Sequence, residues 1–167
     1  DSQVVADIRA ARAAGADLVI PFMHWGWERE LQPSDRQRQL ARTMIDAGAD
    51  VVIGGHPHVT QGAEYYRGKL IVYSLGNFVF DYYPGDPAIW TGWLARLTIS
   101  KSGHVDLQTF ALQIDAIGIP HPCPGPSRTV TTAIRYSPPV LLTLSFSSCA
   151  ANLYGLPFAM TIVGLFQ

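Results

Sequence analysis

The chain has 167 residues, of which 48% are hydrophobic and 15% are charged, and its formal net charge is −1. This length suits one domain that buries a real core, and the near-neutral charge gives no electrostatic reason to expect a nucleic-acid-binding protein, which would carry a basic face. The two cysteines, Cys123 and Cys149, have no spacing that is typical of a metal site or a redox motif.

The chain begins with a predicted helix followed by a buried strand. Apolar residues recur at helical spacing within residues 3–14, and they place one face of that helix in the core: Val4, Val5, Ile8 and Ala11. Gly15 is a natural helix terminator because glycine adopts positive φ without penalty. The continuous apolar run over residues 18–23 then predicts a strand that is buried on both faces, as in a parallel sheet.

A second unit repeats this pattern. Ser34 and Gln37 form a capping-box pair that predicts the start of a helix over residues 35–47. The sequence Ala-Gly-Ala-Asp follows each of the two helices, and the second copy leads into a buried strand over residues 50–53. Strand, helix and strand in this order predict a βαβ unit with two parallel strands.

The pattern changes after this unit. Residues 69–74, 93–100 and 105–114 are predicted to be strands, and Ser102 with Gly103 supplies a plausible turn between the last two. An antiparallel hairpin is therefore expected in the second half of the chain. The whole pattern predicts an α/β fold with a βαβ unit plus antiparallel strands.

Both buried strands of the βαβ unit end at histidine. The first runs into His24, and the second runs into Gly54-Gly55-His56-Pro57-His58. Ligands of open α/β sheets bind at the carboxyl ends of the strands, and imidazole is a ligand for zinc, manganese, iron and nickel. A single histidine at a strand end is more often a hydrogen-bonded core residue, but His24, His56 and His58 together predict a metal site.

Two further residues are candidates for catalysis. Glu28, four residues after His24, is interpreted either as an acid/base, as an acceptor that orients an imidazole, or as a solvated loop carboxylate. Asn77 follows the third predicted strand, within Tyr-Ser-Leu-Gly-Asn-Phe, and would contact a phosphate or a metal-bound water. The alternative for Asn77 is a turn residue selected for its tolerance of a left-handed backbone.

Three motifs, taken together, resemble the capsule biosynthesis CapA family, the poly-γ-glutamate synthesis proteins. They are His-Trp-Gly-x-Glu, then Ala-Gly-Ala-Asp-Val-Val-Ile-Gly-x-His-Pro-His-Val-x-Gln, and then Tyr-Ser-Leu-Gly-Asn-Phe-Val-Phe-Asp. The resemblance implies a calcineurin-like metallophosphoesterase sandwich with four layers in the order α-β-β-α. It also implies two divalent ions (Mn, Zn or Fe), with His24 and His56 sharing one ion and His58 serving the other. Gln61, Glu28 and Asn77 occupy family motif positions.

The resemblance also implies what this chain lacks and what it does. The remaining ligands of such sites lie in N-terminal motifs, so the chain is interpreted as the C-terminal half of the domain, expected to bind metal weakly and to be inactive alone. The implied function is metal-dependent hydrolysis or group transfer in capsule or poly-γ-glutamate synthesis, at the cell surface or membrane. Its partners would be an anionic polymer, a phosphorylated or amide substrate, and a membrane-bound synthesis complex. The alternative is a non-catalytic scaffold in that complex.

The composition changes abruptly near residue 120. Residues 1–120 are assigned to the metallophosphoesterase-like domain, and residues 121–167 are a Pro-rich and then apolar tail in which Arg128 and Arg135 are the only Lys, Arg, Asp or Glu residues. Three interpretations stay open for residues 140–167: a transmembrane helix, a docked C-terminal element, or sequence that is not native to the protein. The third is favoured because the family likeness stops where the composition changes. No signal peptide is visible at the start of the chain.

Overall fold

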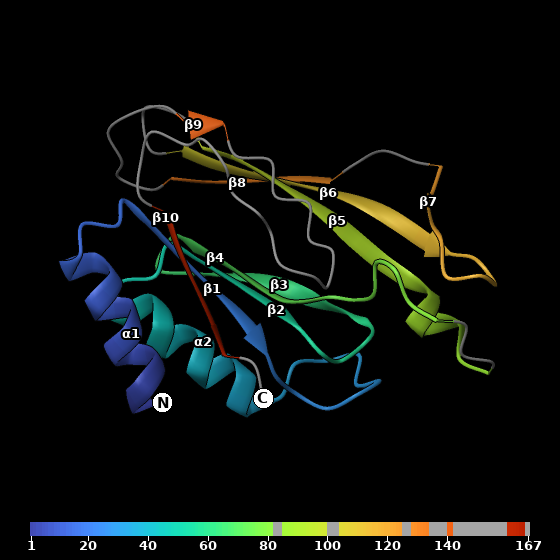
Figure 1. Cartoon of the computed structure of the whole chain (residues 1–167), viewed down its shortest axis with the longest axis horizontal. Helices are drawn as coiled ribbons and strands as arrows, with labels where there is room; N and C mark the ends of the chain where they lie inside the picture. Colours follow the sequence, from blue (N-terminus) through green and yellow to red (C-terminus); the bar gives the residue numbers. More distant parts are fainter. Residues whose placement is uncertain (82–84, 100–103, 125–127, 134–139, 142–159, 166–167) are drawn as a thin grey trace.

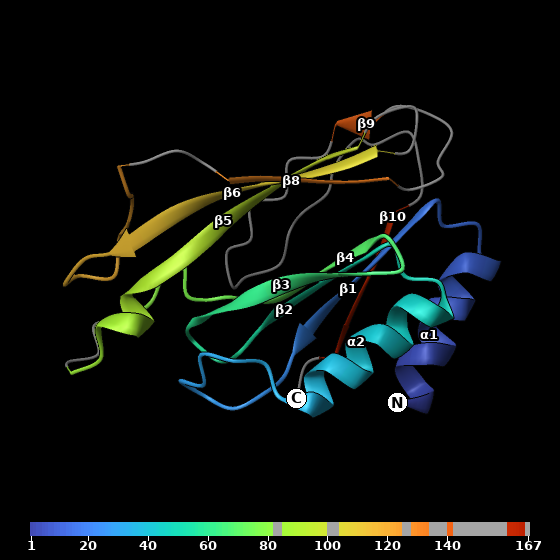
Figure 2. The ribbon, with the colours of Figure 1, turned by 180° about the vertical axis from the view of Figure 1, so that it is seen from behind.

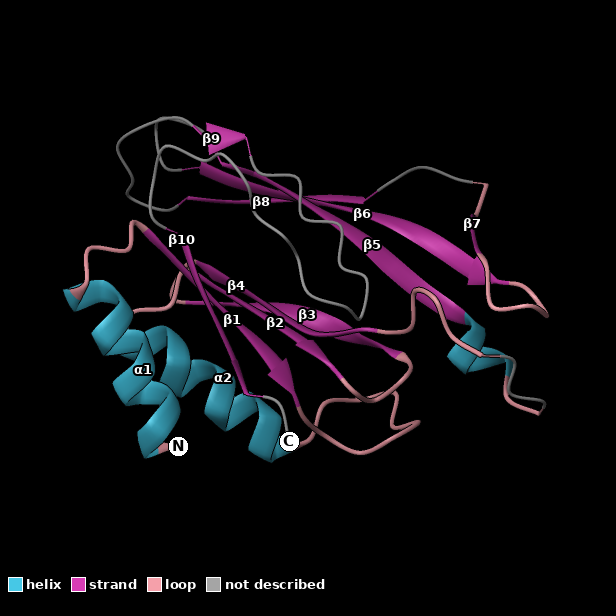
Figure 3. Ribbon diagram, in the orientation of Figure 1, coloured by secondary structure: helices cyan, strands magenta, loops and turns pink. Residues whose placement is uncertain are grey.

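The computed structural model describes residues 1–81, 85–99, 104–124, 128–133, 140–141 and 160–165 (Figures 1 and 3). The elements in chain order are α1 (Ser2–Ala13), β1 (Leu18–His24), α2 (Asp35–Ala47), β2 (Val51–Gly55), β3 (Thr60–Tyr66), β4 (Lys69–Leu75), the 3-10 helix η1 (Pro87–Trp90), β5 (Thr91–Ile99), β6 (His104–Ile114), β7 (Pro120–Pro122), β8 (Arg128–Ala133), β9 (Val140–Leu141) and β10 (Met160–Leu165).

These elements form three layers. The first sheet has the strand order β10-β1-β2-β4-β3, in which only β3 is antiparallel to its neighbour. The second sheet has the order β7-β6-β5-β9, with β8 also pairing with β6. Helices α1 and α2 lie together on one face of the first sheet, and the second sheet lies over its opposite face (Figures 1 and 2).

Two apolar clusters hold the layers together, and β1 contributes to both. Leu18 and Ile20 face the second sheet, where they pack with residues of β2, β4, β5 and β6. Val19 and Met23 face the helices and join the cluster formed with α1 and α2. Because successive side chains of a strand point to opposite faces, a strand covered on both sides must be apolar throughout. Burial on both faces therefore explains the continuous apolar run over residues 18–23.

The α/β class and the βαβ unit are confirmed, with strand bounds shifted by at most two residues. Helix α2 spans the predicted residues, and both hydrogen bonds of the Ser34–Gln37 capping box are present. Strands β1 and β2 are parallel, and β5 and β6 form the expected antiparallel pair. The turn expected at residues 102–103 lies outside the described residues. The described part of the chain forms three layers, and the four-layer metallophosphoesterase sandwich stays a prediction.

Parts of the tail lie in the sheets. Strand β7 extends the second sheet, and β10 pairs in parallel with β1, with Ile20 opposite Ile162. No helix among the described residues is long and apolar enough to cross a membrane. Most of the apolar segment with three open interpretations, residues 142–159, lies outside the described residues.

Candidate metal centre

The candidate site lies where three parallel strands of the first sheet end. His24 is the last residue of β1 and pairs in register with Gly55 of β2, immediately before His56. The ring centroids of His24 and His56 are 4.2 Å apart, and those of His56 and His58 are 5.8 Å apart. The expectation that these strand ends bring three imidazoles together is therefore met by the geometry.

The backbone of the loop after β2 takes an unusual conformation. His56 has φ of 93° and His58 has φ of 61°, and both values lie in the region that favours glycine. Each such residue costs on the order of 1–3 kcal/mol and persists only where its surroundings hold it. Strain of this kind is concentrated at functional sites, and here it falls on the two histidines of the His-Pro-His sequence.

Asn77 fixes the orientation of His58. Its Nδ2 donates to the carbonyl oxygens of Ile89, at 2.8 Å, and of His58, at 3.3 Å, and its Oδ1 lies 2.8 Å from His58 Nδ1. An amide oxygen only accepts, so Nδ1 of His58 carries the proton and its Nε2 is left with a free lone pair. These contacts occupy the Asn77 amide, which is buried. They support a positioning role, which the alternatives raised for Asn77 did not include.

Two glycines allow Asn77 to reach this place. Gly76 has φ of 71°, and it forms an antiparallel bridge with Gly92 at the start of β5. A Cβ on Gly92 would lie 1.8 Å from the carbonyl oxygen of Asn77. The end of β4 therefore crosses the start of β5 at a distance that only glycine permits.

The loop that carries Glu28 is held against the His-Pro-His loop. The backbone N–H of Arg29 donates to the carbonyl oxygen of Pro57 at 2.7 Å. Gln61 of β3 is buried, and its Nε2 donates to the carbonyl oxygen of Glu30 at 2.8 Å. The Gln61 side chain in turn accepts from Gln37 Nε2 at 3.0 Å. Residues on both sides of Glu28 are thereby fixed to neighbouring elements.

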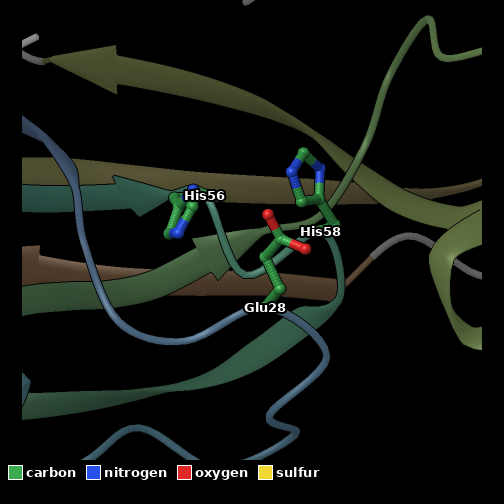
Figure 4. Close-up of side chains that lie close together, drawn as sticks. All are labelled: Glu28, His56 and His58. Atoms are coloured by element: carbon green, nitrogen blue, oxygen red, sulfur yellow. The ribbon is translucent and has the colours of Figure 1, made fainter. Parts of the chain in front are cut away.

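As a result, Glu28 lies with two of the predicted ligands. One ligand atom each from Glu28, His56 and His58 lies within 4.8 Å of the other two. The Glu28 carboxylate points toward the space between the two imidazoles in Figure 4. His24 is not a member of this group, although its ring lies beside His56. The sequence left three roles open for Glu28. Only the fold shows that the Glu28 carboxylate reaches the two imidazoles.

The donor set fits a divalent transition metal. Two imidazoles and one carboxylate are the donors of many catalytic zinc and non-haem iron sites, whereas magnesium and calcium take mainly oxygen ligands. The Glu28 side chain is exposed and those of His56 and His58 are partly exposed, so the group is open to solvent. Of the two tryptophans near it, Trp25 is in the core and Trp27 is 76% exposed.

We expect the pKa of His24 to lie below its usual value of about 6.5. Burial is the main cause of this lowered pKa, and the neighbouring His56 and His58 add repulsion between the protonated rings. Between the pKa of folded His24 and 6.5 the unfolded chain binds the proton more readily, so stability falls as the pH drops through this window and is unaffected above it.

A titration followed by histidine-ring NMR checks this expectation. The midpoint for His24 should lie below 6.5 and should rise in His56→Ala, which removes one repelling neighbour. His121→Ala is the matched control, because His121 lies in β7 and pairs with Asp115. An unchanged His24 midpoint in His56→Ala would contradict the coupling of the two rings.

Comparison with known proteins now adds to this geometry. Residues 1–82 match the family model described as bacterial capsule synthesis protein PGA_cap. The PGA biosynthesis protein CapA of Bacillus subtilis (strain 168) is 61% identical over 66 residues, which cover 40% of this chain and 17% of that protein. Residues 1–82 belong to the PGA_cap family. The capsule biosynthesis protein CapA of Bacillus anthracis is 53% identical over 70 residues, 42% of this chain and 17% of that protein.

A relative with lower identity matches over a longer stretch. A probable polyglutamine synthesis accessory protein of Mycobacterium tuberculosis is 41% identical over 83 residues, which cover 48% of this chain and 20% of that protein. The PGA_cap match includes every element from α1 to β4, and with them all five candidate residues: His24, Glu28, His56, His58 and Asn77. The aligned segment covers only 17% of the length of each Bacillus relative. Strands β5 to β10 lie beyond the residues that match the PGA_cap model.

Proposed function

We propose that this chain is part of a divalent-metal-dependent hydrolase that acts in the synthesis of capsule or poly-γ-glutamate. The observation that carries the proposal is the convergence of imidazoles from two parallel strands with a carboxylate, within the segment that matches the PGA_cap family. The names of the Bacillus relatives, PGA biosynthesis protein and capsule biosynthesis protein, support the polymer context and an association with the cell envelope.

The chain's own residues would have distinct tasks. A divalent ion bound here would polarise a phosphoryl or amide group and activate water. His56, His58 and Glu28 would hold it, Asn77 would keep His58 in the productive tautomer, and His24 would lie within reach of a second ion or of the substrate. We also propose that the three layers described here belong to the four-layer calcineurin-like metallophosphoesterase sandwich, with two ions in the complete domain.

The substrate and partners follow from the same proposal. A cationic centre at the solvent-exposed carboxyl ends of the strands would bind an anionic polymer or a phosphorylated or amide substrate. A membrane-bound synthesis complex is the expected partner, and no nucleic acid is expected, because the net charge is −1.

The test is metal-dependent hydrolysis of bis-p-nitrophenyl phosphate. The chain should be assayed alone and after extension at its N-terminus with the corresponding part of the Bacillus subtilis relative, with manganese, zinc or iron(II). Activity is expected in the extended protein and should fall at least about 100-fold in His56→Ala. Glu30→Gln, an exposed carboxylate on the same loop, is the matched control. No hydrolysis with any of the three metals would contradict the enzymatic proposal and favour the scaffold alternative.

A further inference from the structure

The turn between β6 and β7 lies outside the segment that matches the PGA_cap model, yet its contacts lead to the candidate site. We propose that this turn, residues 115–119, positions the His58 imidazole through Phe80. Asp115 and Gly118 are the positioning residues, and Phe80 carries their effect to the imidazole. The proposal rests on the proposed function only for the use of His58 as a ligand, because the contacts that support it all lie within this chain.

Phe80 is in direct contact with His58. The centroids of the two rings are 4.9 Å apart, and the ring planes are inclined by 43°. Aromatic rings with centroids about 4.5–7 Å apart attract each other. Asn77 Oδ1 lies 2.8 Å from Nδ1 of the same imidazole, so the ring is fixed at one edge by a hydrogen bond and flanked by Phe80. Displacement of Phe80 would therefore leave the imidazole free to tilt about its contact with Asn77.

The backbone of Phe80 lies against Gly118, near the tip of the turn. A Cβ on Gly118 would be 2.7 Å from the carbonyl oxygen of Phe80 and 3.4 Å from its carbonyl carbon. Gly118 is buried and has φ of 87°, whereas its neighbours Ile117 and Ile119 are 78% and 48% exposed. The turn thus meets the segment after β4 through the Gly118 backbone, at a distance that leaves no room for a side chain.

Asp115 sets the conformation of the turn. Its Oδ1 accepts from the backbone N–H groups of Ile117, at 3.0 Å, and Ile119, at 2.9 Å. His121 Nε2 lies 2.8 Å from the other carboxylate oxygen, Oδ2. His121 and the two backbone donors lower the pKa of Asp115, so the carboxylate stays ionised and remains an acceptor. One carboxylate oxygen therefore holds the residues on both sides of Gly118.

Two glycines with the same φ provide the test. Gly118 and Gly15 have φ of 87° and 88°, so alanine is strained to a similar extent at both positions. A Cβ on Gly15, however, meets no atom within 4 Å. Histidine-ring NMR of the 167-residue chain without metal should show shifted His58 resonances in Gly118→Ala and not in Gly15→Ala. Isothermal titration with zinc chloride should show binding about 10-fold weaker in Gly118→Ala alone.

Variants of Asp115 provide a second measurement. Asp115→Ala removes the acceptor of both backbone hydrogen bonds, so it should shift the His58 resonances as Gly118→Ala does. Asp115→Asn keeps an acceptor oxygen on a side chain of the same size, so it should restore the spectrum of the parent chain. His121→Ala is the matched control and should leave the His58 resonances in place, because His121 contacts Oδ2 and not the oxygen that holds the turn.

Two results would overturn the proposal. One is an unchanged His58 spectrum or an unchanged zinc affinity in Gly118→Ala. The other is an equal change in Gly15→Ala, which would trace the effect to backbone strain alone. A response of His58 to the turn in a protein that hydrolyses no phosphodiester would keep the positioning role and reject the hydrolase. Hydrolysis by the extended protein, with a His58 spectrum that does not respond to the turn, would do the reverse.

Discussion

Replacing Gly54 with alanine is expected to destabilise the folded chain by about 3 kcal/mol or more. A Cβ at this position would lie 2.2 Å from the carbonyl oxygen of Tyr73 and 2.3 Å from Trp25 Nε1. These two atoms form a hydrogen bond of 2.9 Å across Gly54, within the core. The added methyl group cannot be accommodated by rotation of a flexible side chain, because Tyr73 contributes backbone and the Trp25 indole is packed against the Tyr73 ring.

The neighbouring glycine is the matched control. A Cβ on Gly55 would meet the Phe22 ring at 3.7 Å, which is an ordinary van der Waals contact, so Gly55→Ala should change stability by about 0.5 kcal/mol or less. Urea denaturation followed by tryptophan fluorescence measures both variants. Equal losses in the two variants would contradict the argument and would place the cost in the flexibility of the loop instead.

The two glycines also show where sequence reasoning reached its limit. Gly54 and Gly55 are the last residues of β2, and the positive φ values fall on His56 and His58 that follow them. Gly54 is required because the Trp25 indole crosses it to donate a hydrogen bond to the carbonyl oxygen of Tyr73, 48 residues further along the chain. A contact of this kind has no periodic signal in the sequence.

Elements with local signals were predicted well, and those with non-local causes were not. The start of α2 was predicted because Ser34 and Gln37 bond to each other's backbone within one turn. Strand β3 was missed because it is an edge strand with few buried side chains, so it lacks the apolar pattern. In the same way, His24, His56 and His58 were chosen from their places at strand ends, whereas the Asn77–His58 contact required the fold.

The second large effect is expected at Asp50, which lies at the amino-terminal ends of the parallel strands, opposite the candidate metal centre. Asp50 is 2% exposed and precedes β2. Its carboxylate accepts from Lys69 Nζ at 2.7 Å and from the backbone N–H of Val19 at 2.9 Å, and it pairs with Arg12. One side chain thus ties the starts of β1, β2 and β4 to helix α1.

Asp50→Ala should lower the free energy of unfolding by about 3 kcal/mol, near the lower end for a broken buried ion pair because the two cations are partly exposed. The repeated Ala-Gly-Ala-Asp sequence supplies the control. Asp17 occupies the equivalent place in the first copy but is exposed, so Asp17→Ala should change stability by about 0.5 kcal/mol or less. Thermal and urea unfolding of the two variants gives the comparison. Similar stabilities for both would mean that water replaces the lost carboxylate at Arg12 and Lys69, and that the starts of the strands are held by apolar packing alone.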